Sequence, residues 1–238
     1  MPLIRRTFPV GALGCNCTIL ACPDTREALV IDPGDDADAI LADLARDGLT
    51  AVKLLHTHAH FDHVMGTADV AAATGAEVIL HRDDRWLYDR TLMQIEAFGG
   101  FRRPDGQPWH PPPPPTRELI GDEVLSFGRR EARALHTPGH TPGSTCFYLE
   151  RRSDPAQSGA ADGAIESAPI LLAGDTLFAG SIGRTDLWGG SLDTIRRSIR
   201  ERLFALPDET LVIPGHGPPT TIAAERESNP FVGSAHFS

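Results

Sequence analysis

The chain contains 238 residues, of which 41% are hydrophobic and 23% charged, a composition typical of a globular protein that buries its own core without disulfides. Its formal net charge of -10 argues against nucleic acid or an anionic membrane as the main partner, because both are polyanions. The four cysteines lack the spacing of a structural zinc site, and we interpret them as free thiols. With no apolar run of signal or membrane-spanning length, the sequence predicts a cytoplasmic protein without a membrane partner.

The first half of the chain alternates strands and helices. Short apolar runs bounded by turn residues predict strands, and apolar residues spaced three and four apart predict amphipathic helices. This alternation favours a mostly parallel sheet covered by helices. The strands are expected at residues 4–10, 17–21, 27–31, 51–55 and 77–81, and the helices at 38–46, 64–74 and 83–98.

The second half is expected to belong to the same domain, which spans 1–238. Residues 99–115 form a Pro-rich connector, and its five final prolines, 111–115, favour an extended polyproline II conformation. Residues 151–168 lack periodicity and are rich in Ala, Ser, Gly and Asp, which predicts a flexible loop. Further strands are expected at 118–127, 129–135, 145–150, 170–173 and 211–213, and helices at 191–206 and 221–228.

Residues 54–66 carry the densest group of chemically active side chains, directly after an apolar strand. His58 and His60 lie two apart and so face the same side of an extended chain. Asp62 and His63 follow in a predicted turn that swings them toward the same point. Because zinc and similar divalent ions take imidazole and carboxylate ligands, we interpret these four residues as part of a metal site rather than as a solvated loop.

Three later segments contain further candidates, His140, Asp175 and His216. Asp175 and His216 each follow an apolar run, as His58 does, and open sheets place their ligands beyond the strand ends. The sequence therefore predicts one shared pocket. The remaining histidines are expected to be structural (His81, His110 and His236), a core or supporting residue (His56) and a supporting residue that orients a ligand (His136).

The motif His58-x-His60-x-Asp62-His63 and the segments around His140, Asp175 and His216 resemble the metallo-β-lactamase superfamily, particularly its short bacterial glyoxalase II-like hydrolases. The resemblance implies an α/β fold, a four-layer αβ/βα sandwich with the metals at one edge. It also implies two metal sites that share a bridging carboxylate. The first ion would be held by His58, His60 and His140, the second by Asp62, His63 and His216, and both by Asp175.

The implied reaction is hydrolysis of a small-molecule thioester such as S-D-lactoylglutathione. Two divalent ions, expected to be zinc with iron or manganese as alternatives, would supply a bridging hydroxide that attacks the carbonyl. Asp62 is the expected catalytic residue, because it can orient the hydroxide or accept its proton. A thiolate leaving group needs little protonation, so the reaction requires no separate general acid.

The resemblance also nominates one residue for substrate binding. Residues 175–186 resemble the glyoxalase II segment whose basic residue contacts glutathione, which makes Arg184 the candidate. An ion pair of Arg184 with Asp186 or Asp193 is the equal alternative. Asp186 stands where the family has an aromatic residue, and no counterpart of the helical C-terminal domain of larger glyoxalases II is expected.

Other functions stay open. A glutathione persulfide dioxygenase would use one Fe(II) held by His58, His140 and Asp175, since two histidines and one carboxylate leave iron open to dioxygen. A hydrolase of another ester or of a lactone would use the same metal motif. A metal-stabilised scaffold would instead recruit a partner through residues 111–115, although we interpret that run as a stiff surface connector.

Overall fold

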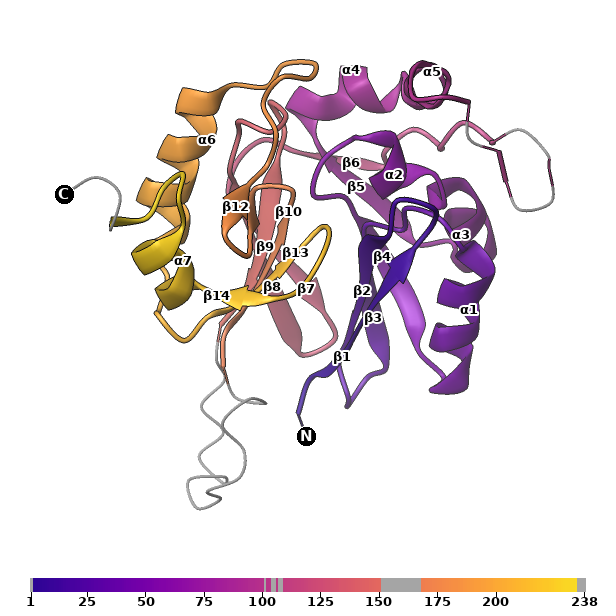
Figure 1. Ribbon diagram of the computed structural model, residues 1–238. Helices are drawn as coiled ribbons and strands as arrows, with labels where there is room; N and C mark the ends of the chain where they lie inside the picture. The colour runs from indigo at the N-terminus through magenta and orange to yellow at the C-terminus, as the bar shows by residue number, and fades with distance from the viewer. Residues whose placement is uncertain (1, 101, 104–105, 107–108, 151–167, 235–238) are drawn as a thin grey trace.

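The computed structural model describes residues 2–100, 102–103, 106, 109–150 and 168–234. Within them, two six-stranded sheets lie face to face (Figure 1). The first sheet contains, in spatial order, β1 (Ile4–Val10), β2 (Cys15–Ala21), β3 (Glu27–Ile31), β4 (Thr50–Leu55), β5 (Glu77–His81) and β6 (Arg117–Leu119). The second contains β14 (Thr220–Thr221), β13 (Leu211–Pro214), β10 (Ile170–Gly174), β9 (Thr145–Leu149), β8 (Arg130–His136) and β7 (Glu123–Phe127).

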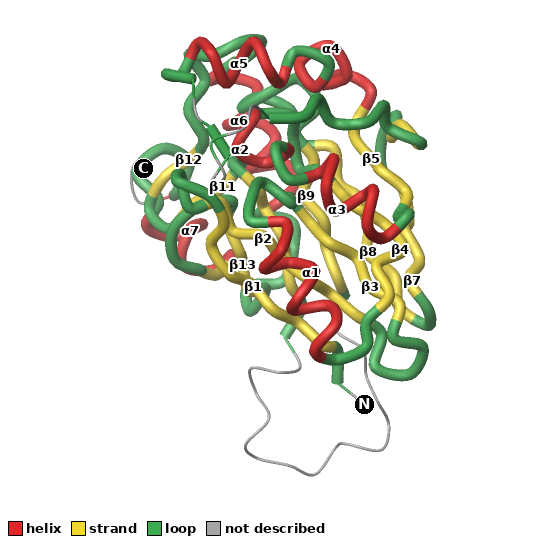
Figure 2. Tube along the Cα trace, turned by 90° about the vertical axis from the view of Figure 1, so that its right-hand side faces the viewer, coloured by secondary structure: helices red, strands yellow, loops and turns green. Residues whose placement is uncertain are grey.

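Helices cover the outer face of each sheet. Helices α1 (Ala37–Arg46) and α3 (Thr67–Thr74) lie on the first sheet, as the side view in Figure 2 shows. Helices α6 (Leu192–Ser198) and α7 (Ile222–Ser228) lie on the second (Figure 1). The order helix, sheet, sheet, helix confirms the four-layer αβ/βα sandwich.

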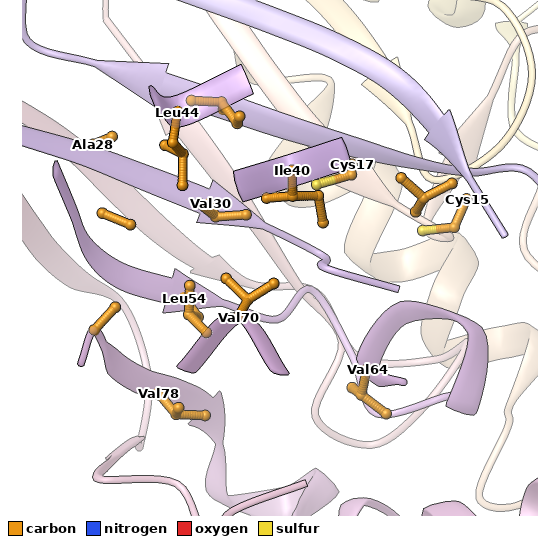
Figure 3. Packing of buried hydrophobic residues seen from close by; sticks show 14 of the residues in the cluster. Cys15, Cys17, Ala28, Val30, Ile40, Leu44, Leu54, Val64, Val70 and Val78 are labelled. Carbon is orange, nitrogen blue, oxygen red and sulfur yellow. The ribbon is translucent and has the colours of Figure 1, made fainter. Parts of the chain in front are cut away.

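The strand periodicity explains how one sheet packs on both sides. Successive strand side chains point to opposite faces, so β2 directs Ile19 toward α1 and Leu20 toward the second sheet. Strand β4 does the same with Leu54 and Leu55. Figure 3 shows Leu54 and Ile40 of α1 within the helix-facing core. At these positions both faces of the sheet are therefore apolar and packed.

Two predicted helices are interrupted. The helix expected at 64–74 consists of α2 (Phe61–Val64) and α3, with Gly66 between them. The amide of Gly66 donates to the carbonyl of Pro33 at 2.9 Å, and a Cβ at this position would lie 2.8 Å from that oxygen. This contact with the loop after β3 breaks the helix, and a sequence pattern does not show it. The helix expected at 83–98 is divided into η1 (Arg82–Asp84), α4 (Arg85–Tyr88) and α5 (Thr91–Ala97).

Some predicted strands and their pairing also need correction. The strand expected at 118–127 is two strands, β6 and β7, which belong to different sheets. The mostly parallel sheet is found only from β3 to β6, because β1, β2 and β3 pair antiparallel. In the second sheet β10 and β13 are parallel, while the other pairs are antiparallel. The helix expected at 191–206 is α6 followed by a π-helical turn, η2 (Ile199–Leu203).

The two predicted irregular segments have different outcomes. The proline run 111–115 follows the surface, and the hydroxyl of Tyr88 donates to the carbonyl of Pro113 at 3.0 Å. It is a connector between α5 and β6 in this structure. The flexible loop predicted at 151–168 lies, apart from Ala168, outside the described residues. Across the described part of the chain, no helix has both the length and the hydrophobicity needed to cross a bilayer.

Candidate metal centre

Buried side chains fix the conformation of the loop after β4 by accepting hydrogen bonds from its backbone amides. Asp32, directly after β3, accepts from the amide and the hydroxyl of Thr57, each at 2.7 Å. Asp84 accepts from the amide of Ala59 at 2.9 Å, and Gln94 accepts from that of Phe61 at 3.1 Å. Such bonds satisfy buried backbone donors that a strand or helix would otherwise pair. The histidines between these anchors are thereby fixed in direction.

His58, His60 and His140 form the first triad. The Nε2 atom of His140 lies 3.2 Å from Nε2 of His58 and 2.9 Å from Nδ1 of His60. His140 comes from the loop between β8 and β9, so the triad joins the two sheets at one edge. Burial, together with the neighbouring imidazoles, lowers the pKa of His58 and that of His60 well below the usual value. The rings are therefore neutral at pH 7 and offer lone pairs to a metal.

Asp62, His63 and His216 form the second triad. Nε2 of His216 lies 3.1 Å from Oδ2 of Asp62 and 3.2 Å from Nε2 of His63. Burial raises the pKa of Asp62, but the adjacent His63 and His216 outweigh it and lower the pKa overall. The carboxylate is ionised, as a metal ligand must be. The structure therefore groups these three side chains as the resemblance implied.

Asp175 lies between the triads and directs one oxygen to each. Its Oδ2 is 3.7 Å from Nε2 of His140, and its Oδ1 is 3.5 Å from Nε2 of His63 and 3.9 Å from Nε2 of His216. Oδ1 is buried and has no hydrogen-bond partner in the described part of the chain. Gly215 makes this approach possible, since a Cβ there would lie 2.1 Å from Oδ1. All seven predicted ligands thus converge.

The donor set fits two divalent cations. Metal–ligand bonds of about 2.0–2.2 Å in tetrahedral geometry place neighbouring donor atoms roughly 3.3–3.6 Å apart. The spacings within both triads lie near this range, and imidazole with carboxylate is the donor chemistry of zinc, iron or manganese. A cation beside Oδ1 of Asp175 would also satisfy that orphaned acceptor.

Hydrogen bonds on the outer ring nitrogens determine which nitrogen faces the centre. Nδ1 of His140 donates to the carbonyl of Arg184 at 2.8 Å, and Nδ1 of His216 donates to that of Leu13 at 3.2 Å. Nδ1 of His63 lies 3.0 Å from Oδ2 of Asp32. Because a carbonyl can only accept, Nδ1 carries the hydrogen, and in the neutral rings the lone pairs lie on the Nε2 atoms of His140 and His216.

The other histidines lie outside both triads. His56 is buried in the core, where Nδ1 donates to the carbonyl of Ile79 at 3.1 Å. His81 and His136 stack with ring centroids 3.9 Å apart, and Nε2 of His136 donates to the carbonyl of Pro142 at 2.9 Å. His136 thus supports the loop after His140 rather than a ligand ring. His110 is exposed, and His236 lies outside the described residues.

Arg184 lies beside the first triad through its backbone, while its guanidinium points into solvent. Both of its hydrogen bonds to the carboxylate of Asp186 measure 2.8 Å, and the two side chains are 55% and 68% exposed. The ion-pair alternative with Asp186 is therefore present, and a pair with Asp193 is not found. The role of Arg184 in substrate binding stays a prediction.

Two supporting residues, Asp32 and Asp84, were not predicted from the sequence. Asp32 and Asp84 follow β3 and β5, which flank β4, and each accepts from the loop that bears His58 and His60. Asp84 also accepts from the hydroxyl of Thr141 at 2.7 Å and the amide of Gly143 at 2.6 Å, so it connects the two loops of the first triad. The sequence feature that could have identified them is an aspartate just after each of the two strands that flank β4.

Comparison with known proteins gives the family. A family model described as the metallo-beta-lactamase superfamily matches residues 10–154 and 163–216. The chain belongs to this superfamily. It is 35% identical over 229 residues to the probable metallo-hydrolase YqgX of Bacillus subtilis, with 95% of this chain and 96% of the relative covered. It is 32% identical over 228 residues to hydroxyacylglutathione hydrolase GloC of Haemophilus influenzae, with coverages of 95% and 97%.

Solved structures give the same fold. The B3 metallo-beta-lactamase BLEG-1 matches with 35% identity and a TM-score of 0.78, covering 96% of this chain and 99% of that one. TTHA1623 in a di-iron-bound form matches with 36% identity and a TM-score of 0.74, with coverages of 94% and 98%. ETHE1 from Myxococcus xanthus matches with 26% identity and a TM-score of 0.72, with coverages of 96% and 84%. These three structures thus share the fold of this chain, and one of them is described with two iron ions.

Proposed function

We propose that the protein is a binuclear metal-dependent thioester hydrolase of the glyoxalase II type. The observation that carries the proposal is the pair of triads that share Asp175, with one carboxylate oxygen directed to each. Bound divalent ions would supply a Lewis acid and lower the pKa of water toward neutrality. The Nε2 atoms of His58 and His216 would hold one ion each, together with the rest of their triads.

Asp62 is the residue proposed to act on the attacking water. Its carboxylate is ionised, 14% exposed and within 3.1 Å of Nε2 of His216, so it can accept a hydrogen bond from the attacking water and orient it. A thiol leaving group has a pKa near 8.5, so it departs as a thiolate without a positioned acid. This chemistry suits a thioester better than an amide, whose amine must be protonated.

S-D-lactoylglutathione is the proposed substrate, and likeness to GloC, named a hydroxyacylglutathione hydrolase, supports it. Arg184 is the proposed contact for a carboxylate of the thiol part. Two aromatic side chains lie near the first triad. The centroid of the Trp188 ring is 6.3 Å from that of His60 and 5.8 Å from that of Phe98. An apolar wall beside a cation can hold the chain of a thiol while its charged end meets Arg184.

The proposed cofactors are two divalent ions, with zinc first and iron or manganese as alternatives. Imidazole and carboxylate suit all three, and the neighbour TTHA1623 is described in a di-iron-bound form. We propose a cytoplasmic location, a small-molecule partner and no nucleic acid or membrane partner, on the basis of the acidic charge balance.

The deciding experiment measures metal content and thioester cleavage on the same preparation. Protein with two ions per chain should cleave S-D-lactoylglutathione, and Asp62→Asn should lose most of that rate while it keeps its fold. Asp24→Asn, at the exposed turn between β2 and β3, is the matched control and should behave as wild type. Metal-loaded protein that cleaves no thioester in a panel of acyl and thiol groups would refute the proposal.

A glutathione persulfide dioxygenase is the second candidate, because two histidines and one carboxylate of the centre form the ligand set that leaves Fe(II) open to dioxygen. His58, His140 and Asp175 would hold its single Fe(II). The discriminating measurement is oxygen uptake with glutathione persulfide. Uptake by protein with one iron per chain would favour this candidate, whereas two ions and no uptake would exclude it. A lactone and a β-lactam belong in the same substrate panel, since BLEG-1 is named a metallo-beta-lactamase.

A further inference from the structure

One residue of the first sheet holds the chain on both sides of a metal ligand in the second sheet. The side-chain amide of Asn16, on β2, donates to the carbonyl of Pro214 and to that of Gly217, each at 3.0 Å. The backbone amide of Asn16 donates to the carbonyl of Gly215 at 2.7 Å. The two side-chain bonds span 198 and 201 positions in the sequence, and His216 of the second triad lies between their acceptors.

We propose that Asn16 is a positioning residue that controls how firmly the second triad holds its ion. Asn16 is not itself a predicted ligand, and it acts through the backbone of the loop that carries His216. The inference rests on the binuclear centre of the proposed function and assigns the occupancy of one of its sites to a residue of the opposite sheet.

Strand parity explains why Asn16 reaches this loop. Its neighbours Cys15 and Cys17 belong to the core between the first sheet and α1, as Figure 3 shows. The side chain between them points to the opposite face of β2, which is the face toward the second sheet. Strand β13 ends at Pro214, and the loop that follows it lies beside the first sheet (Figure 1).

The His216 loop has little freedom on the side away from Asn16. A Cβ at Gly215 would lie 2.1 Å from Oδ1 of Asp175 and 2.8 Å from Cε1 of His63, so the backbone here packs directly against two ligands. The carbonyl of the same glycine is bound by Asn16. The loop is therefore clamped between Asn16 and the ligands, and a loss of either side lets His216 move relative to Asp175.

The ring of His216 has a separate anchor that cannot replace this clamp. Its Nδ1 donates to the carbonyl of Leu13 at 3.2 Å, in the exposed turn between β1 and β2. That bond orients the ring, whereas Asn16 holds the backbone that carries it. Asn16 also lies on a strand that pairs with β1 on one side and β3 on the other, which is a firmer support than a surface turn.

Removal of the Asn16 amide should affect metal binding more than folding. The bonds to Pro214 and Gly217 are partly exposed, so water can replace the lost donors and the protein should stay folded. Water does not restore the position of the loop. Residues that orient metal ligands are typically worth 10- to 100-fold in metal affinity, and we expect an effect of about tenfold or more, confined to the second triad.

The first experiment is a Co(II) titration of the full chain of Asn16→Ala, with a competing chelator. The dissociation constant of the second site should rise about tenfold or more, and that of the first should equal wild type. Tyr88→Phe is the matched control, because it removes another side-chain donor to a proline carbonyl at 3.0 Å, outside both triads. It should lower the melting temperature and change neither constant. Unchanged constants in Asn16→Ala, or an equal loss at both sites, would overturn the proposal.

A double-mutant cycle tests whether the effect passes through His216. His140→Ala weakens the first triad and His216→Ala the second, so each variant reports mainly on the other site. Asn16→Ala added to His140→Ala should weaken the remaining ion about tenfold. Added to His216→Ala it should change nothing, because the side chain that Asn16 positions is absent. The same loss in both backgrounds would show a general structural role and reject the proposal.

Asn16→Asp keeps the shape of the side chain and decides the matter if Asn16→Ala does not fold. A carboxylate can only accept, so it repels both carbonyls that the amide binds. The affinity of the second site should fall, although a negative charge alone would attract a cation. An affinity equal to or above that of wild type would overturn the role of the amide donors.

Thioester cleavage gives an independent measurement. At limiting metal, kcat of Asn16→Ala should fall with the occupancy of the second site while KM stays unchanged, and excess metal should restore the rate. Affinities that change as expected without cleavage of any thioester would support the role of Asn16 and reject the proposed function. Cleavage with unchanged affinities would reject the role of Asn16 and leave the proposed function intact.

Discussion

The two triads that share Asp175 differ in charge and in exposure. His58, His60 and His140 are at most 6% exposed, and all three ligands are neutral rings. In the second triad Asp62 brings a negative charge, and the side chains of Asp62 and His216 are 14% and 27% exposed. Solvent therefore reaches the centre through the second triad more than through the first. The first triad acts as a closed wall behind it.

The difference follows from what supports each triad. Asp84, fully buried, connects the loop of His58 and His60 to the loop of His140. His216 is oriented instead by a carbonyl of the surface turn at Leu13. An interior carboxylate with three donors leaves little freedom, while a surface turn can move. We infer that the first triad is rigid and that adaptation to substrate occurs at the second.

The largest expected effect comes from removing what both triads share. Asp175→Asn replaces the ionised carboxylate, so neither site keeps its full charge. Supporting residues of metal sites are typically worth 10- to 100-fold in affinity or activity, and we expect this direct ligand to cost more than about 100-fold in kcat/KM. Metal analysis should show both ions reduced, while Asp24→Asn keeps both. Full activity in Asp175→Asn would show that the two triads are independent sites.

The contrast in exposure predicts two rates of metal loss. A chelator should remove one ion from the open second triad about 10- to 100-fold faster than the other from the closed first triad. His216→Ala should lack the fast phase, and His140→Ala should lack the slow one. Metal release followed with a colorimetric indicator measures both phases. A single phase that both variants slow equally would remove the distinction between the triads.

The hydrogen bonds of Asp84, which connect the two loops of the first triad, can be tested through the pH dependence of stability. Burial raises the pKa of Asp84 from 3.8 to about 6 in the folded protein, against the opposing effect of its hydrogen bonds. Because the folded pKa lies above the unfolded value, the contribution to stability is complete below pH 3.8 and is lost as pH rises through about 6. A shift of this size corresponds to ~3 kcal/mol in the free energy of unfolding.

Asp84→Asn does not titrate, so the difference between wild type and variant isolates this group. The unfolding free energy of wild type minus that of the variant should fall by ~2 kcal/mol from pH 4 to pH 6.5, in denaturant titrations with chelator present. At pH 7 and with metal, the variant should retain its fold and lose about tenfold in activity, since one amide cannot accept from all three donors. A difference that stays flat with pH would mean that the carboxylate is already charged at pH 4.

The sequence predicts the local part of this centre well and the support poorly. His58, His60, Asp62 and His63 are neighbours in the chain, so strand parity and a turn suffice to bring them together. Asp175 could be predicted because it directly follows an apolar strand, and strand ends of this kind meet at one edge of a sheet. Asp84 lay inside a segment expected to be a continuous helix, and its donors come from residues 25 to 59 positions away. Nothing local marks a residue whose role depends on two distant loops.

The same reasoning explains the errors in the fold. The break at Gly66 depends on the carbonyl of Pro33, which is 33 residues away, so helix periodicity alone cannot show it. Residues 118–127 have one continuous strand pattern, yet β6 pairs with β5 and β7 pairs with β8. Two sheets that share one apolar interior impose the same alternation on both strands, and only the pairing partner distinguishes them.

The smallest expected effect concerns Arg184, whose backbone lies beside the first triad and whose guanidinium is exposed to solvent. Its pair with Asp186 is exposed and contributes little to stability, so variants should melt as wild type does. If Arg184 binds the carboxylate of a glutathione thioester, Asp186 competes for the same guanidinium. Asp186→Ala should then lower KM about two- to threefold, and Arg184→Ala should raise it about three- to tenfold. A thioester of an uncharged thiol should respond to neither substitution, and added salt should weaken both effects.

Glu150→Ala, which breaks the similarly exposed pair with Arg133, is the control. A KM that rises in both Arg184→Ala and Asp186→Ala would show that the pair acts as a structural unit of the loop and not as a substrate contact.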